Sequence, residues 1–309
     1  MSLSARIVLS VMRGIKKTGL IKGPSADLEA ALRKAKEYNR RHPYREPKDR
    51  KAVYQTRWVD GYPCLVIRTA KEPHKAILFL HGGGDHDTWK MEVSFARRYG
   101  KQAGMDVYYP IYPPFTEASP VQTAKLIFHV YQEMVKEYGA DKVAVVGGSY
   151  GGFLAMQLLT WINRNNAHGQ KAHVEMPRLL IMNSPFGYPK TEEEWKRAQE
   201  LEKDDAMITP GAFRAMLGLT LKLSPDTPGS LLHPADMDFH GAPETYVFYT
   251  EEACLAVADA IKHRYVRDGV GERMHMHIEP GMMHCYASAP VFPESREDFH
   301  RQIARLRQI

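Results

Sequence analysis

The 309-residue sequence has few cysteines and no long apolar run. Its three cysteines, Cys64, Cys254 and Cys285, form no CxxC pair, and an odd number cannot all pair within one chain. This excludes a disulfide framework and favours a reducing, cytoplasmic compartment. No apolar stretch approaches the roughly 20 residues that a membrane-spanning helix needs. The sequence therefore predicts no stable membrane insertion.

Phosphate-binding and nucleic-acid-binding motifs are also missing. No strand-like segment is followed by G-x-x-x-x-G-K-[ST] or G-x-G-x-x-G. The formal net charge is +6, but lysine and arginine alternate with acidic residues along the chain rather than forming a basic stripe. We therefore expect no nucleic-acid partner. The 44% hydrophobic and 25% charged residues are typical of a globular domain with a sizeable core.

The N-terminal segment has the pattern of an amphipathic helix. Arg6 and Arg13 bracket a short apolar run that Ser10 interrupts, whereas a signal peptide needs an uninterrupted apolar run. We expect the helix to pack on the domain, with a membrane-surface role as the alternative. The apolar residues at helical spacing are Ile7, Val8, Val11, Met12 and Ile15.

Strand-like and helix-like segments alternate along most of the chain after a leading hairpin around Asp60-Gly61. Such alternation predicts an α/β fold with a mostly parallel sheet and helices on both faces. The expected strands are Val53–Trp58, Tyr62–Arg68, Ala76–Leu80, Val107–Tyr112, Val143–Val146, Leu179–Asn183, Thr245–Thr250 and Arg273–Glu279. The expected helices, besides the N-terminal one, are Ala26–Arg40, Val121–Tyr138, Phe153–Ile162, Glu192–Lys203, Leu255–Arg267 and Glu294–Arg307.

One insertion interrupts this alternation, and it divides the chain into a core and a cap. We expect residues 51–186 and 241–309 to form the α/β core. Residues 1–50 would supply N-terminal cap helices, and residues 187–240 would supply a helical, irregular cap insertion. Both cap parts are expected to lie together over the sheet.

Glycines surround one serine where a strand pattern becomes a helix pattern. The stretch is Gly147-Gly148-Ser149-Tyr150-Gly151-Gly152, after the apolar run Val143–Val146. A tight strand-to-helix turn strains the central residue, and side chains two before or two after it would clash, so Gly147 and Gly151 are required there. This is the G-x-S-x-G pattern that exposes a nucleophilic serine at a helix N-terminus.

A second glycine-rich loop, His81-Gly82-Gly83-Gly84, follows the strand-like run Ala76–Leu80. Its glycines leave backbone N–H groups free to face an oxyanion. Together with the N–H of Tyr150, they predict an oxyanion hole for a tetrahedral intermediate. We expect His81 to orient this loop rather than to act as an acid or base.

A base and an acid are expected after the last two strands. A serine hydroxyl needs a base to take its proton, and His284 lies in the loop after the last strand. The acid should follow Thr245–Thr250, where the residues leave Glu251 and Glu252 open. His275 and His277 alternate on one strand, but further ligands at zinc-like spacing are missing, so we predict no metal site.

Taken together, these motifs resemble the hormone-sensitive-lipase-like esterases, the bacterial family IV type of α/β hydrolase. The resemblance runs from residue 53 to the end, and the N-terminal helices and the insertion resemble that family's cap. It implies an α/β-hydrolase fold and a serine carboxylesterase for short to medium acyl esters, including acetyl esters. It also implies a small-molecule ester substrate and no cofactor, and a homodimer is the family's habit.

Carried over residue by residue, the resemblance makes Ser149 the nucleophile and His284 the base. Gly83, Gly84 and Tyr150 would supply the oxyanion N–H groups. Aligning Gly269 with the glycine that closes the family's helix places Glu252 where the family usually has Asp. Leu3, Ile7 and Val11 of the cap would then line an apolar acyl pocket.

Two features depart from the family and keep other functions open. Gly148 stands where the family usually has an acidic residue, and Tyr109–Phe115 reads YPIYPPF instead of a Tyr-Arg-x-Ala-Pro-Glu segment. The Gly-Gly-Ser-Tyr-Gly-Gly elbow also resembles that of prolyl-oligopeptidase-like peptidases. The alternatives are therefore a serine peptidase for small peptides and a non-catalytic binding protein that retains the fold.

Overall fold

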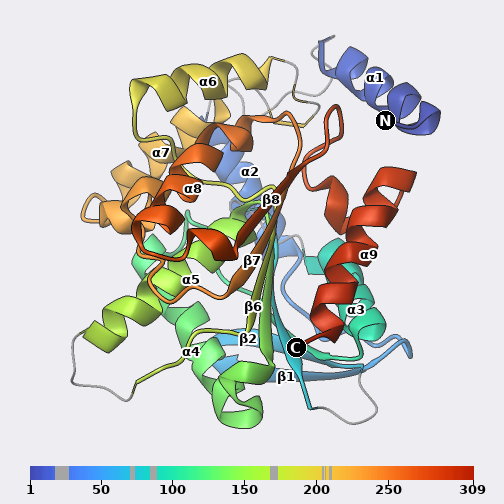
Figure 1. The fold of residues 1–309 in the computed structure, drawn as a ribbon, viewed down its shortest axis with the longest axis vertical. Helices are drawn as coiled ribbons and strands as arrows, with labels where there is room; N and C mark the ends of the chain where they lie inside the picture. Colours follow the sequence, from blue (N-terminus) through green and yellow to red (C-terminus); the bar gives the residue numbers. More distant parts are fainter. Residues whose placement is uncertain are drawn as a thin grey trace.

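The computed structural model describes residues 1–17, 28–69, 74–83, 89–167, 173–203, 205, 207–208 and 211–309. These residues build one central sheet with the strand order β1-β2-β4-β3-β5-β6-β7-β8 (Figure 1). The strands are β1 (Val53–Val59), β2 (Tyr62–Arg68), β3 (Ala76–Leu80), β4 (Asp106–Pro110), β5 (Val143–Gly148), β6 (Leu179–Asn183), β7 (Glu244–Tyr249) and β8 (Met274–Ile278).

The sheet is antiparallel at one edge and parallel elsewhere. β1 and β2 form the expected hairpin, whose turn residues Asp60 and Gly61 have φ angles of 50° and 84°. β2 also pairs antiparallel with β4, while every pairing from β4 through β8 is parallel. The expected α/β fold with a mostly parallel sheet is confirmed.

Helices cover both faces of the sheet, as the alternating pattern predicted. In Figure 1, α4, α5 and α8 lie on one side, and α3 and α9 lie on the other. The helices are α1 (Leu3–Lys17), α2 (Leu28–Arg41), α3 (Trp89–Ala103), α4 (Pro120–Tyr138), α5 (Tyr150–Ala167), α6 (Glu192–Glu202), α7 (Ala212–Leu223), α8 (Ala258–Arg267) and α9 (Pro293–Arg307).

Two apolar clusters form the core, one against each face of the sheet. Alternate residues of β3 divide between them, because successive side chains of a strand point to opposite faces. Leu78 packs in the cluster that contains Phe153 of α5, whereas Ile77 packs in the cluster that contains Phe299 of α9. Both faces of β3 are therefore buried, which explains its uninterrupted apolar sequence.

Helix α3 was absent from the sequence expectations. Its buried residues Val93, Ala96 and Tyr99 recur every third residue, so a helical signal was present in the sequence. The expected helix Leu255–Arg267 also differs in detail. Its first part, Ala253–Val257, is a 3₁₀ turn, and the α-helix begins only at Ala258.

The parts expected to form a cap lie near the carboxyl ends of the parallel strands. Helix α6 contacts the 3₁₀ turn Ala253–Val257 that follows β7. Helix α1 lies against the loop after β8, where its Arg13 donates a hydrogen bond to the carbonyl of Gly281 at 3.1 Å. The division into core and cap stays a prediction.

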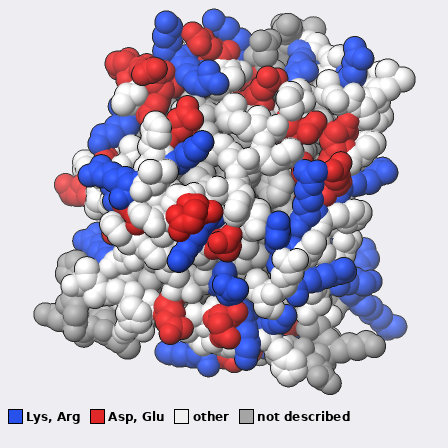
Figure 2. Space-filling model, in the orientation of Figure 1, with Lys and Arg blue, Asp and Glu red and all other residues white. Residues whose placement is uncertain are grey.

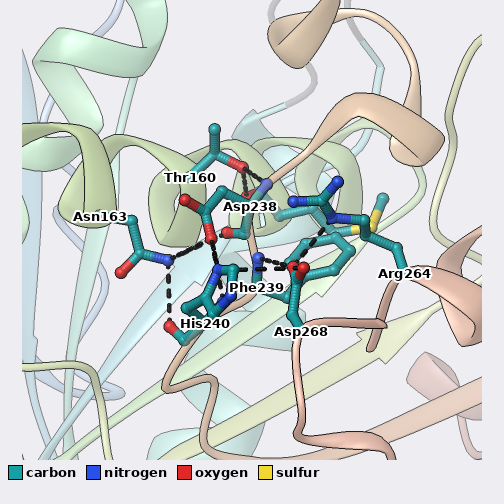
Figure 3. Close-up of polar contacts among 8 residues, drawn as sticks. Thr160, Asn163, Asp238, Phe239, His240, Arg264 and Asp268 are labelled. Carbon is teal, nitrogen blue, oxygen red and sulfur yellow. Dashed lines mark hydrogen bonds and ion pairs between the residues drawn. The ribbon is translucent and has the colours of Figure 1, made fainter. Parts of the chain in front are cut away.

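A polar cluster fixes the segment that leads into β7 (Figure 3). Buried Asp268 accepts hydrogen bonds from the backbone N–H of Phe239 at 2.7 Å and from Nε of Arg264 at 2.9 Å. Asp238 accepts from Nδ2 of Asn163 on α5 at 2.9 Å. These bonds join α5 and α8 to the segment that enters β7.

Charge is distributed over the surface in both signs. Figure 2 shows acidic and basic side chains interleaved over much of one face, with more basic side chains toward the lower right, where α3 and α9 lie. Within the described part of the chain, no helix is long and apolar enough to cross a membrane.

Candidate active site

Ser149 occupies a strained turn between β5 and α5. Its φ angle is 53°, a left-handed value that residues other than glycine seldom adopt. The backbone N–H of Ser149 donates to the carbonyl of Asn183 at 2.8 Å, which ties the turn to the end of β6. Such strain persists only where the surroundings hold it, and it is common at reactive side chains.

Glycines beside Ser149 are required by close backbone contacts. A Cβ at position 147 would lie 2.4 Å from the carbonyl oxygen of Gly151, and a Cβ at position 151 would lie 2.0 Å from the carbonyl oxygen of Leu80. A Cβ at position 152 would lie 2.8 Å from Cβ of Pro185. The expected need for Gly147 and Gly151 is confirmed, with Gly152 as an addition.

Glu252 and His284 meet at the carboxyl ends of β7 and β8. Oε2 of Glu252 is hydrogen-bonded to Nδ1 of His284, and the Glu252 side chain is 1% exposed. An ionised carboxylate can only accept, so Nδ1 is the donor, which leaves Nε2 as the free basic nitrogen. Glu251 is exposed, so the structure pairs Glu252 rather than Glu251 with the histidine.

A buried thiol completes this group. The polar atoms of Glu252, Cys254 and His284 all lie within 4.8 Å of one another. Burial raises the pKa of Cys254 to about 12, so this thiol is neutral at neutral pH.

The pKa of His284 follows from its neighbours. Burial disfavours the imidazolium, but the charges of Cys285, Glu252 and Cys254 outweigh this effect and hold the pKa well above the ordinary histidine range. The carboxylate of Glu252 is bonded to the ring and is one source of this raised pKa. His284 is therefore a strengthened base.

Two hydroxyl side chains position the loop that carries His284. Ser184 Oγ accepts the N–H of Cys285 at 2.9 Å, and Thr250 Oγ1 accepts the N–H of Met282 at 3.0 Å. Sγ of Cys285 bonds to the carbonyl of Asn183 at 3.3 Å, the same carbonyl that accepts the N–H of Ser149. The histidine loop and the serine turn therefore share one anchoring carbonyl.

The loop after β3 reaches the serine turn. A Cβ at position 82 would lie 3.5 Å from Cβ of Ser149. His81 stacks on Tyr112 with ring centroids 4.0 Å apart, and the Tyr112 hydroxyl donates to the His81 carbonyl. This agrees with the expectation that His81 orients the loop. Gly83 has a φ angle of 69°, and the predicted oxyanion residue Gly84 lies outside the described residues.

Glu92 of α3 is a partly buried acid that the sequence analysis missed. Its two carboxylate oxygens lie 3.2 and 3.3 Å from the backbone N of Gly82. Burial raises its pKa to about 7, although the Gly82 hydrogen bond and the charge of His284 act in the opposite direction. The signal was a lone acid ten residues after Gly82, and the sequence could not show where this acid lies in the fold.

Comparisons with known proteins identify the family of the chain. Residues 77–288 match the family model described as alpha/beta hydrolase fold. The chain belongs to the alpha/beta hydrolase fold family. This hydrolase is 23% identical over 251 residues to the versiconal hemiacetal acetate esterase of Dothistroma septosporum, covering 77% of this chain and 75% of that protein.

Solved structures share the fold of this hydrolase at low sequence identity. An esterase from the bacterial hormone-sensitive lipase family superimposes with a TM-score of 0.77 at 19% identity, covering 100% of this chain and 98% of the other. A putative esterase from Staphylococcus aureus gives a TM-score of 0.73 at 20% identity, covering 92% of each chain. The expected α/β-hydrolase fold is confirmed, and these neighbours are of the kind that the motifs resemble.

The placement of three cap residues corrects a sequence expectation. Leu3, Ile7 and Val11 were expected to line an acyl pocket, but their exposed fractions are 71%, 57% and 56%. The side chains of α1 that pack inward are Ala5 and Leu9 instead. The helical period was correct, but the sequence did not show which of two apolar faces the hydrolase would bury.

Other acidic side chains of this hydrolase pair with histidines or amides. Asp238 bonds to Asn163 and His240, so it is engaged in the cluster that leads into β7 (Figure 3). His275 contacts Glu244 at 2.8 Å, and His277 contacts Asp298 at 3.3 Å.

Proposed function

We propose that the protein is a serine carboxylesterase that hydrolyses short to medium acyl esters, acetyl esters included. The observation that carries this proposal is the hydrogen bond between buried Glu252 and His284 beside the strained Ser149 turn. The esterase relatives support it. The substrate would be a small-molecule ester, and no cofactor is needed for this chemistry.

In the proposed reaction, Ser149 Oγ attacks the ester carbonyl while Nε2 of His284 takes its proton. Glu252 holds the ring in the tautomer with Nδ1–H and stabilises the imidazolium that forms. The backbone N–H groups of Gly83, Gly84 and Tyr150 would bind the oxyanion at the start of α5, where the helix dipole also favours negative charge. His284 then protonates the leaving alcohol, and water releases the acyl group by the reverse sequence.

The test is hydrolysis of p-nitrophenyl acetate, butyrate, octanoate and dodecanoate by wild type and Ser149→Ala. We expect turnover that peaks at short or medium chains and falls to the uncatalysed rate in Ser149→Ala. Labelling by a fluorophosphonate probe should also require Ser149. Ester turnover that survives Ser149→Ala would overturn the proposal, and so would a wild type that neither turns over esters nor reacts with the probe.

Peptide p-nitroanilides belong in the same assay, because the Gly-Gly-Ser-Tyr-Gly-Gly elbow also resembles that of prolyl-oligopeptidase-like enzymes. Probe labelling with peptide turnover and no ester turnover would favour the peptidase. Absence of labelling would favour a binding protein that retains the fold. Homodimerisation and a cytoplasmic location stay predictions from the sequence.

A further inference from the structure

Helix α1 is fastened to the loop that leads to His284. Its Ala5 and Leu9 are fully buried in the core cluster that contains Met282. Arg13 of α1 donates to the carbonyl of Gly281 at 3.1 Å. At the start of the helix, Ser2 Oγ donates to Glu294 of α9 at 3.0 Å. Figure 1 shows α1 above the upper end of α9, at the periphery of the fold.

A second apolar face of α1 is open to solvent. Leu3, Ile7, Val11 and Ile15 recur every four residues and therefore form one stripe along the helix. Their side chains are 71%, 57%, 56% and 39% exposed, and Val8 beside them is 44% exposed. Single exposed apolar residues need no explanation, but a contiguous stripe marks an interaction surface.

The charge of α1 has one sign. Its sequence LSARIVLSVMRGIKK carries Arg6, Arg13, Lys16 and Lys17 and no acidic residue. In contrast, α9 mixes both signs, with Glu294, Glu297 and Asp298 among its arginines. A helix that combines an apolar stripe with only basic charges has the composition of helices that lie in the plane of an anionic membrane surface.

We propose that α1 docks this protein on the surface of an anionic lipid bilayer. The Leu3–Ile7–Val11–Ile15 stripe would enter the boundary between headgroups and acyl chains, and the exposed side chain of Arg6 would contact anionic headgroups. Because α1 packs on residues 281–283, docking would turn the loop before His284 toward the bilayer. This inference does not depend on the proposed esterase activity, since the binding can be measured without turnover.

Charge favours a bilayer over a second copy of the chain as the occupant of the stripe. Two copies paired through α1 would bring two basic helices together, and α1 has no acid to compensate them. Anionic headgroups instead attract each Lys and Arg near the surface, in a way that salt weakens.

The test is co-sedimentation with vesicles of phosphatidylcholine alone and of phosphatidylcholine mixed with phosphatidylglycerol. We expect binding to the anionic vesicles that high salt reduces, and little binding to phosphatidylcholine alone. The double variant Ile7→Ser/Val11→Ser should bind anionic vesicles roughly tenfold or more weakly, since it removes two apolar side chains from the interface. Arg6→Gln should weaken the binding to a smaller extent.

The matched control is Val53→Ser/Val266→Ser, which removes two side chains that are 67% and 62% exposed elsewhere on the surface. It should bind anionic vesicles like the wild type. Circular dichroism of each variant checks that the fold is retained. Equal binding by wild type and Ile7→Ser/Val11→Ser, or no binding of the wild type to anionic vesicles, would overturn the proposal.

Two further outcomes would assign the stripe to another occupant and also overturn the proposal. Analytical ultracentrifugation could show a wild-type dimer that Ile7→Ser/Val11→Ser dissociates, without vesicle binding. Alternatively, Ile7→Ser/Val11→Ser could raise KM for soluble long-chain esters while vesicle binding stays unchanged. That result would show that Ile7 and Val11 contact the acyl chain of the substrate.

Discussion

Glu252 accepts a hydrogen bond from Nδ1 of His284, although the two residues are 32 positions apart in the chain. The side chain of Glu252 is 1% exposed, whereas its neighbour Glu251 is exposed. A carboxylate buried against an imidazole fixes the ring and strengthens it as a base. The predictions that follow start from this pair and extend to the contacts that hold its surroundings.

Glu252→Gln should lower kcat for ester hydrolysis by roughly 10³–10⁴-fold, because an amide no longer selects the Nδ1–H tautomer of His284. It should also move the acidic limb of the pH–rate profile to lower pH. His284 is active only when deprotonated, and loss of the carboxylate lowers its raised pKa. Glu251→Gln is the matched control and should resemble the wild type. Equal effects of the two substitutions on kcat would contradict the assignment of Glu252 as the acid that pairs with His284.

Glu92→Gln should stabilise the protein at alkaline pH. The pKa of Glu92 is raised from 4.5 to about 7, so its stabilising contribution is present in full below about pH 4.5 and is lost as pH rises through 7. Above pH 7, the partly buried carboxylate costs about 3 kcal/mol of stability, which a neutral amide avoids. Thermal unfolding of wild type and variant at several pH values measures this difference. A stability difference that does not change with pH would contradict it.

Gly151→Ala should destabilise the fold by several kcal/mol, because the new Cβ would lie 2.0 Å from the backbone oxygen of Leu80. Backbone on both sides leaves no flexible group to move away. Gly218→Ala in α7 is the control, because its Cβ would meet nothing within 4 Å. It should stabilise the helix by about 0.5–1 kcal/mol. Denaturant unfolding of both variants measures the change in the free energy of unfolding. It would show whether the close contact with Leu80, or the loss of a glycine as such, causes that change.

Arg68→Ala should destabilise the protein by about 3 kcal/mol, because it leaves the fully buried carboxylate of Asp106 without its cation. Nη1 of Arg68 lies 2.7 Å from Oδ2 of Asp106. Arg40→Ala removes an exposed ion pair with Glu37 and should leave the stability of the protein almost unchanged, because water screens the two charges. Urea denaturation of the two variants tests this contrast. Similar losses of stability in both would show that the burial of Asp106 does not determine how much stability is lost.

Several features of the site could be predicted from the sequence because they depend on local chain geometry. The turn at Ser149 needs glycines at fixed positions in a strand-to-helix junction, and those glycines can be read directly from the sequence. The strands could be predicted for a similar reason, since β3, β4, β5 and β6 are buried on both faces and read as short apolar runs. Chain order also pointed to a base after the last strand.

The tertiary structure decided what depends on contacts between distant segments. The sequence left Glu251 and Glu252 open, and only the turn after β7 determined which carboxylate faces His284. The sequence could not place Glu92, because its role arises from the approach of α3 to Gly82.

Helix α1 shows both contributions in one element. The sequence determined its helical period and its basic charge, because both are properties of a single segment. The tertiary structure decided that Ala5 and Leu9 are buried while Leu3, Ile7 and Val11 stay exposed. That choice depends on the surface that the helix meets, and the loop after β8 and the start of α9 supply this surface only when the chain is folded.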